Sequence, residues 1–374
     1  MAAGRAARPK DGGGARPARG PTGARFERRR AAAAMAAMAA EAAEDGATRT
    51  LPSLRRLSRA LPFGRTHGRL VASPRGRLMG RALCSQENAD PQKTAFLLRK
   101  AWTLYSVTPL YGFRRGRLRD YGRLLGAFIA AERQKGLAVE VGVELDIRVG
   151  LSSLAELRGS ELDQAALLVQ LSSRSRASSR GSEDKLLWSG WFCSVFGDDL
   201  SENVPEDFTC LPLFLTHGAE SYTSLVGSWF QKTFDCCFRR LAISPLNLSW
   251  MVAMWAGCKL ERAASAVELV FSVPRLSHPL DISYAIHPED AKALWDTVQK
   301  TPGEITQEEV DVFMDCLYAH FHRHFKIHLA AAKLVKVSTA VASAHCDGIV
   351  KILHSQYLPG VLMLLTELAI SQIQ

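Results

Sequence analysis

Four closely spaced histidines are the residues of this chain whose spacing could bind a metal: His320, His322, His324 and His328. On a helix, His320 and His324 form an i,i+4 pair, as do His324 and His328, and zinc sites use that spacing. No H-E-x-x-H pattern or cysteine pair accompanies them, and Arg323 and Lys326 would repel a cation. We interpret the cluster as a helix end, where His, Arg and Lys complement the negative end of the helix dipole.

A second candidate for chemistry is Gly197-Asp198-Asp199, which offers paired carboxylates. A turn after a buried strand prefers the same residues, and that explanation is sufficient. The chain contains no G-x-S-x-G, P-loop or G-x-G-x-x-G pattern. The sequence therefore predicts no catalytic residue, no cofactor site and no metal site. A metal-dependent or nucleic-acid-modifying nuclear enzyme that uses the His320–His328 cluster is the alternative function.

A basic, aromatic segment could contact phosphates: Tyr111, Phe113, Arg114, Arg115, Arg117, Arg119, Tyr121 and Arg123. Two interpretations stay open. Charge runs are usually exposed, solvated faces. Alternatively, arginines position a nucleic-acid backbone without reading its bases. On the second interpretation we predict that Arg114, Arg115 and Arg117 contact DNA phosphates.

The histidines follow two helices with clear start and stop signals. His287-Pro288-Glu289-Asp290 starts a helix, because proline fits the first turn and carboxylates suit the positive end of the dipole. Thr301-Pro302-Gly303 ends that helix, and Thr306-x-x-Glu309 is a capping box that starts the next. The remaining pattern predicts helices at about 96–107, 118–135, 219–236 and 245–259, and strands within 137–141, 145–149, 167–171, 186–196, 208–215, 266–273 and 280–286.

The C-terminal segment alternates β-branched residues from Leu334 to Ala344. Asp347-Gly348 predicts a hairpin turn with positive φ at both positions, and Ile349–Leu353 returns as the second strand before a short apolar helix after Pro359. The first strand carries little charge, and an exposed edge of that kind pairs with another chain. We therefore predict a partner contact at four residues: Val335, Val337, Thr339 and Val341.

The charge of the chain is concentrated in its first 90 residues. They hold 18 Lys and Arg against 7 Asp and Glu, a net charge of +11. Residues 91–374 hold the other 29 Lys and Arg and the other 30 Asp and Glu, a net charge of −1. We predict that residues 1–85, rich in Arg, Ala, Gly and Pro, are disordered. The acid-free stretch 51–70 leaves an organelle transit peptide as the alternative.

Eight scattered cysteines without a C-x-x-C pair indicate reduced, buried thiols. The apolar runs are far too short for a membrane span. Residues 172–185 are rich in serine and arginine and predict a flexible loop. Arg176-Ala177-Ser178 and Arg180-Gly181-Ser182 fit basic-directed kinases, so Ser178 and Ser182 are predicted phosphorylation sites.

Grouped strands and segregated helices predict an α+β fold with mainly antiparallel pairing. From about Cys84 to the C-terminus, long runs carry a family resemblance, among them DPQKTAFLLRKAWTLYSVTPLYGF from Asp90, LLWSGWFCSVFGDDL from Leu186, LNLSWMVAMW from Leu246 and VSTAVASAHCDG from Val337. The chain resembles the centromere protein L family, subunits of the constitutive inner-kinetochore network.

The resemblance implies two α/β lobes around curved sheets, which we place at 90–275 and 276–374, the second serving dimerisation. It further implies a nuclear, non-enzymatic scaffold at the kinetochore that pairs obligately with centromere protein N. Centromere protein C, other inner-kinetochore subunits, the centromeric nucleosome and linker DNA are the further implied partners, with no membrane.

Overall fold

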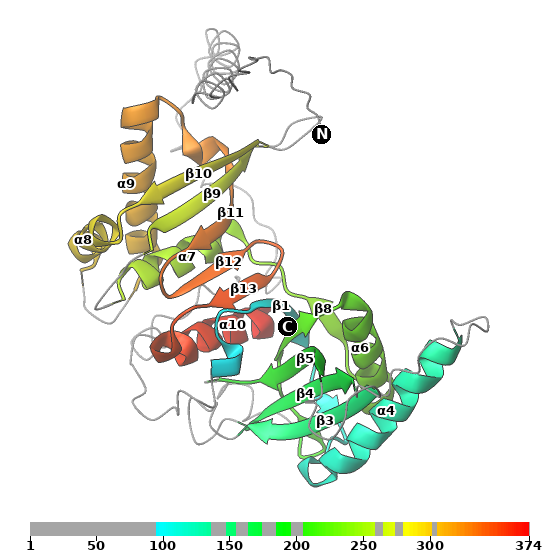
Figure 1. Cartoon of the computed structure of the whole chain (residues 1–374). Helices are drawn as coiled ribbons and strands as arrows, with labels where there is room; N and C mark the ends of the chain where they lie inside the picture. Colours follow the sequence, from blue (N-terminus) through cyan, green and yellow to red (C-terminus); the bar gives the residue numbers. More distant parts are fainter. Residues whose placement is uncertain are drawn as a thin grey trace, which may run out of the picture. The chain divides into compact units, whose positions relative to one another are not determined.

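The computed structural model describes residues 95–135, 147–154, 164–173, 185–195, 205–258, 265–273, 280–300 and 305–373 (Figure 1). Its α-helices are α4 (Leu118–Lys135), α6 (Glu220–Phe234), α7 (Pro245–Ala256), α8 (Pro288–Val298), α9 (Gln307–Phe325) and α10 (Leu358–Ile373). Short 3-10 helices are η1 (Ala95–Leu97), η2 (Arg115–Arg117), η3 (Leu329–Ala331) and η4 (Ser355–Tyr357). The helices predicted from residue 118 onward are confirmed.

The strands are β1 (Ala101–Val107), β2 (Leu110–Tyr111), β3 (Ile147–Leu154), β4 (Ala166–Ser173), β5 (Lys185–Cys193), β6 (Phe208–Thr209), β7 (Leu213–Gly218), β8 (Phe238–Arg240), β9 (Val267–Val273), β10 (Leu280–Ile286), β11 (Lys333–Ser338), β12 (Ala342–His345) and β13 (Ile349–Ile352). One sheet has the order β10-β9-β11-β12-β13-β1-β7-β5-β4-β3, with β8 also on β1, and β2 pairs with β6. Because every pair is antiparallel, the predicted α+β class is confirmed.

β1 joins the two halves of the sheet. On one side its residues 103–106 pair with β7, and on the other side β13 pairs with 101–103 and β8 with 105–107. The helix predicted here is wrong, apart from the short turn η1. Trp102, Leu104 and Val107 are fully buried in the sheet, and a strand covered on both faces shows no alternation from which it could be distinguished from a buried helix.

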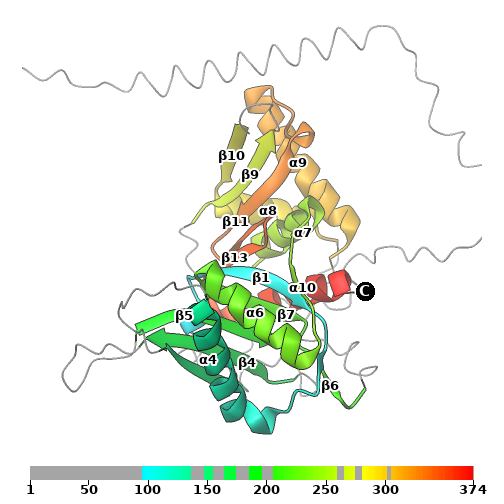
Figure 2. The same cartoon turned by 90° about the vertical axis from the view of Figure 1, so that its right-hand side faces the viewer.

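Two hydrophobic clusters lie on the two faces of the N-terminal half of the sheet. Along β7, Leu213 and Leu215 belong to one cluster and Phe214 to the other, as the period of a strand requires. α4 and α6 cover the face of Phe214, and Figure 2 shows them side by side over these strands. α10 packs on the opposite face, against β1 and β7. Both faces of β1 and β7 are therefore covered.

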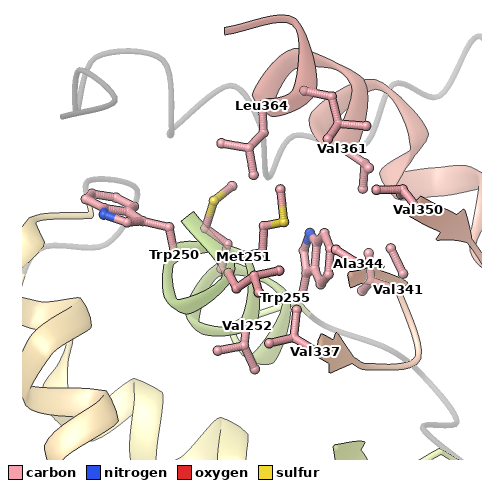
Figure 3. Packing of buried hydrophobic residues seen from close by; sticks show 14 of the residues in the cluster. Trp250, Met251, Val252, Trp255, Val337, Val341, Ala344, Val350, Val361 and Leu364 are labelled. Atoms are coloured by element: carbon pink, nitrogen blue, oxygen red, sulfur yellow. The ribbon is translucent and has the colours of Figure 1, made fainter. Parts of the chain in front are cut away.

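The other half of the sheet has one covered face. α7 packs on β11, and α8 and α9 pack on α7. Figure 3 shows Met251 and Trp255 of α7 between the strands and α10, which presents Val361 and Leu364. The six tryptophans from Trp188 to Trp295 are all buried and belong to the core.

The C-terminal hairpin is a three-stranded meander. The expected single strand over Leu334–Ala344 divides into β11 and β12, because Thr339 turns the chain: its hydroxyl accepts from the N–H groups of Val341 and Ala342. The turn after β12 is present, but only Gly348 has a positive φ, +75°. His345 pairs with Ile349, so three residues form the loop, with glycine in its left-handed position.

All described residues fall in one compact unit, Arg69–Gln374. The expected lobe boundary at 275/276 lies between β9 and β10, which pair along seven residues. The division into lobes stays a prediction. No helix among the described residues is long and apolar enough to cross a membrane.

Candidate functional site

The four histidines do not converge on one point. His320, His322 and His324 lie in the last turns of α9, which ends at Phe325 with Lys326 in a left-handed conformation. His320 packs on His324, with ring centroids 4.6 Å apart, and His322 stacks on His328 at 3.9 Å. The Nδ1 atom of His320 is 2.6 Å from the Tyr284 hydroxyl. The helix-end interpretation accounts for these positions.

The strand predicted as a partner-binding edge is internal. β11 pairs with β9 on one side and with β12 on the other. Val337, Thr339 and Val341 are buried, and Val335 is half-buried. The premise of an exposed edge is therefore wrong. β9, which lies more than sixty residues earlier in the chain, occupies the side that the local pattern leaves open.

The free edge of this half of the sheet is β10. Its exposed residues alternate with the half-buried Ile282, the buried Tyr284 and the half-buried Ile286, which pack on the core. Tyr284 packs on Phe321 of α9, and Phe321 packs on Phe325, whose exposed fraction is 60%. No described strand pairs with the outer side of β10. The sequence indicated β10 as a strand but not as an edge.

The basic segment lies at the start of α4. Arg114, Arg117 and Arg119 are exposed, and Arg115 is half-buried, with its guanidinium 3.4 Å from the Ser153 hydroxyl of β3. Arg117 and Arg123 lie 3.8 and 4.0 Å from Asp120, long separations for exposed ion pairs. Of the interleaved aromatic residues, Phe113 and Tyr121 are buried and stacked, and Tyr111 is exposed. Contact of these arginines with DNA stays a prediction.

Several predicted features lie outside the described residues. They are Asp198, Asp199, Ser178, Ser182, most of the serine–arginine loop, the strand at 137–141 and the N-terminal tail. Their predictions stay untested. The seven described cysteines are reduced thiols, and four of them are buried. Burial raises the pKa of the Cys210 thiol to about 11 and that of Cys258 to about 12, so both thiols stay protonated at neutral pH.

Comparison with known proteins assigns the chain to a family. The model of the family described as Centromere protein L matches residues 96–370. Centromere protein L of Gallus gallus is 72% identical over 336 residues, which cover 88% of this chain and 96% of the relative. The Homo sapiens protein is 59% identical over 85% of this chain and 92% of its own length. The Danio rerio protein is 39% identical over 82% of this chain and 85% of its own length. The described fold lies almost wholly within the matched residues, and the chain belongs to the centromere protein L family.

Proposed function

We propose that the chain is a non-enzymatic scaffold of the inner kinetochore in the nucleus, where it pairs with centromere protein N. The observation that carries the proposal is membership of the centromere protein L family across residues 96–370. The pairing with centromere protein N, and with centromere protein C and other inner-kinetochore subunits, rests on the resemblance described above.

The edge strand β10 supports a partner-binding role and gives it a location. Ile282 and Ile286 face the core but stay half-exposed, so a strand added to β10 would complete their burial. Main-chain hydrogen bonds and alternate side-chain contacts are what strand addition supplies. Phe325, next to this edge, is a large exposed anchor. We place the contact with centromere protein N at β10 and Phe325 in place of β11.

The exposed arginines at the start of α4 support a second contact, with linker DNA. Such a contact is electrostatic and independent of base sequence. Phosphorylation of Ser178 and Ser182 would add about −1.5 to −2 charges at each site and oppose that contact if the loop faces DNA.

Co-expression tests the scaffold proposal. The tagged chain and centromere protein N should co-purify and elute as a one-to-one complex on size exclusion, and a fluorescent fusion of the chain should overlap a centromere marker. A chain that elutes alone and stays away from centromeres would contradict the proposal. A fusion of residues 1–83 that redirects a reporter to mitochondria would favour the transit-peptide alternative.

A further inference from the structure

The turn between β12 and β13 holds three different metal-ligating side chains in a row: His345, Cys346 and Asp347. Among the described residues, this group brings its ligand atoms within 4.8 Å of one another. It follows the histidines of α9 after η3, β11 and β12. The sequence patterns singled out none of its members as a metal ligand, because zinc signatures separate their ligands by two or more residues.

One ligand atom from each residue lies within 4.8 Å of the other two, so a rotation of the Asp347 carboxylate would bring the three to the spacing that one small cation requires. Cys346 Sγ is 3.8 Å from His345 Nδ1 and 3.6 Å from an Asp347 carboxylate oxygen, and His345 Nδ1 is 3.4 Å from the other oxygen. A tetrahedral zinc ion with bonds of about 2.0–2.3 Å holds its ligand atoms roughly 3.4–3.6 Å apart. Imidazole nitrogen, thiolate sulfur and carboxylate oxygen are all zinc ligands.

The backbone of the turn is held by hydrogen bonds to three other segments. The Cys346 N–H donates to the Val335 carbonyl of β11 at 2.8 Å, and the Cys346 carbonyl accepts from the Ile243 N–H at 2.9 Å. The Gly348 carbonyl accepts from Leu104 N–H of β1 at 2.8 Å, and Arg240 Nε donates to the Asp347 carbonyl at 3.2 Å. A site whose backbone is fixed in this way loses little freedom when it binds a ligand.

The side chains themselves make only weak local contacts. The Asp347 N–H donates to His345 Nδ1 at 3.2 Å. An imidazole nitrogen has one lone pair, so a cation bound at Nδ1 would replace this single hydrogen bond. The Asp347 carboxylate oxygen 3.4 Å from Nδ1 would be a second ligand of the same cation.

We propose that His345, Cys346 and Asp347 bind one zinc ion, with water in the fourth position. Binding transfers the thiol proton of Cys346 to solvent, so one thiolate and one carboxylate balance the two positive charges of zinc. Arg240 and Lys333, the cations near the turn, therefore face a neutral complex. Solvent reaches the site, because the side chains of His345 and Asp347 are 37% and 66% exposed.

Zinc titration of the purified full-length chain tests the proposal, with native mass spectrometry for stoichiometry and cobalt(II) absorption for sulfur ligation. The wild-type chain should bind one ion and, with cobalt, show a thiolate charge-transfer band. Cys346→Ser and Asp347→Asn should weaken binding by at least about tenfold and Cys346→Ser should remove the band. Cys316→Ser, at another half-buried cysteine, and the double variant His320→Ala/His324→Ala should bind as the wild type does.

Melting curves separate loss of the site from loss of the fold. Without zinc, Cys346→Ser should melt near the wild-type temperature, and added zinc should raise only the wild-type Tm. The proposal is overturned if the wild type binds no stoichiometric zinc or if Cys346→Ser binds equally well. It is also overturned if the α9 double variant loses the ion.

Discussion

The Tyr105 hydroxyl of β1 donates a 2.8 Å hydrogen bond to the Glu220 carboxylate in the first turn of α6, across 115 residues of sequence. Burial, then the hydrogen bond and the charge of Glu220, raise the pKa of Tyr105 to about 12. This one bond ties the central strand to a helix of the N-terminal half. A buried donor and a charged acceptor make it stronger than a neutral surface bond.

Tyr105→Phe should therefore lower the free energy of unfolding by about 1–3 kcal/mol at pH 8, since Glu220 loses its donor. The unfolded chain loses the Tyr105 proton near its ordinary pKa of 10.0, before the folded chain does. The stabilisation is present below pH 10 and is lost as the pH rises toward 12. Denaturant melts at pH 8 and pH 11 should show the difference between wild type and Tyr105→Phe shrinking. A difference that grows with pH would contradict this account.

Removing the Glu309 carboxylate from the capping box of α9 should lower the free energy of unfolding, with a pH dependence opposite to that of Tyr105→Phe. Glu309 accepts hydrogen bonds from Lys300 N–H at 2.7 Å, Thr306 N–H at 2.8 Å and the Thr306 hydroxyl at 3.0 Å. Burial raises the pKa of Glu309, but these hydrogen bonds lower it further, so the net shift is downward from the ordinary 4.5. Glu309→Gln should cost about 1–3 kcal/mol at pH 7.

The stabilisation by Glu309 is present above the unfolded pKa and is lost as the pH falls through the lowered folded value. The gap between wild type and Glu309→Gln should therefore narrow below pH 4.5. Glu308→Gln is the matched control, because the carboxylate of Glu308 is exposed and pairs with Lys300 Nζ at 3.2 Å. Equal losses in the two variants, measured by thermal and urea unfolding, would show that the capping box contributes nothing specific.

Two glycines predict opposite effects of the same substitution. Gly348→Ala places a Cβ against the Leu241 carbonyl in a backbone with φ of +75°, so the variant should lose more than about 2 kcal/mol. Gly227→Ala lies within α6 with no atom near the added Cβ, and it should gain up to about 1 kcal/mol from higher helix propensity. Unfolding curves of both variants check the pair. A stable Gly348→Ala protein would mean that the turn relaxes.

The proposed partner surface predicts unequal effects at two exposed apolar residues of α9. Phe325, 60% exposed beside β10, should behave as an anchor: Phe325→Asp should weaken binding to centromere protein N by about 2 kcal/mol, or ~30-fold in Kd. Val312, 44% exposed near the start of the helix, is the control, and Val312→Asp should bind normally. Titration of the partner into each folded variant decides between them. Normal binding by Phe325→Asp would place the interface elsewhere.

The arginines before α4 predict the salt dependence of DNA binding. The triple variant of Arg114, Arg115 and Arg117 to Glu should reduce the slope of log K against log salt by about 0.9 for each phosphate that these arginines neutralise in the wild type. A variant with Lys300, Arg323 and Lys351 changed to Glu alters the net charge equally and should keep the slope. Fluorescence anisotropy at several salt concentrations measures both. An equal reduction of the slope in the two variants would indicate that only net charge matters.

Local signals in the sequence predicted the elements whose causes are local. α4 begins at Leu118 and ends at Lys135 as its 3.6-residue pattern indicates, and α9 begins where Thr306 and Glu309 form the capping box. The reciprocal hydrogen bonds of the box join Thr306 and Glu309, which are close in sequence, so a local pattern can predict them. The family resemblance likewise follows from long runs of residues in the sequence alone.

Tertiary structure decided what depends on distant neighbours. β1 is a strand because β7, β8 and β13 all form hydrogen bonds with it. The residues of β1 alone do not predict these bonds. The edge of the sheet is also set by distant pairing. β9 lies between β11 and β10, so β11 is internal and β10 is the edge strand. The backbone of the turn that carries His345–Asp347 lies against a distant segment, since a Cβ at Gly348 would meet the Leu241 carbonyl. Strand neighbours are set by pairing over long sequence separations, and a pattern within one segment contains no information about them.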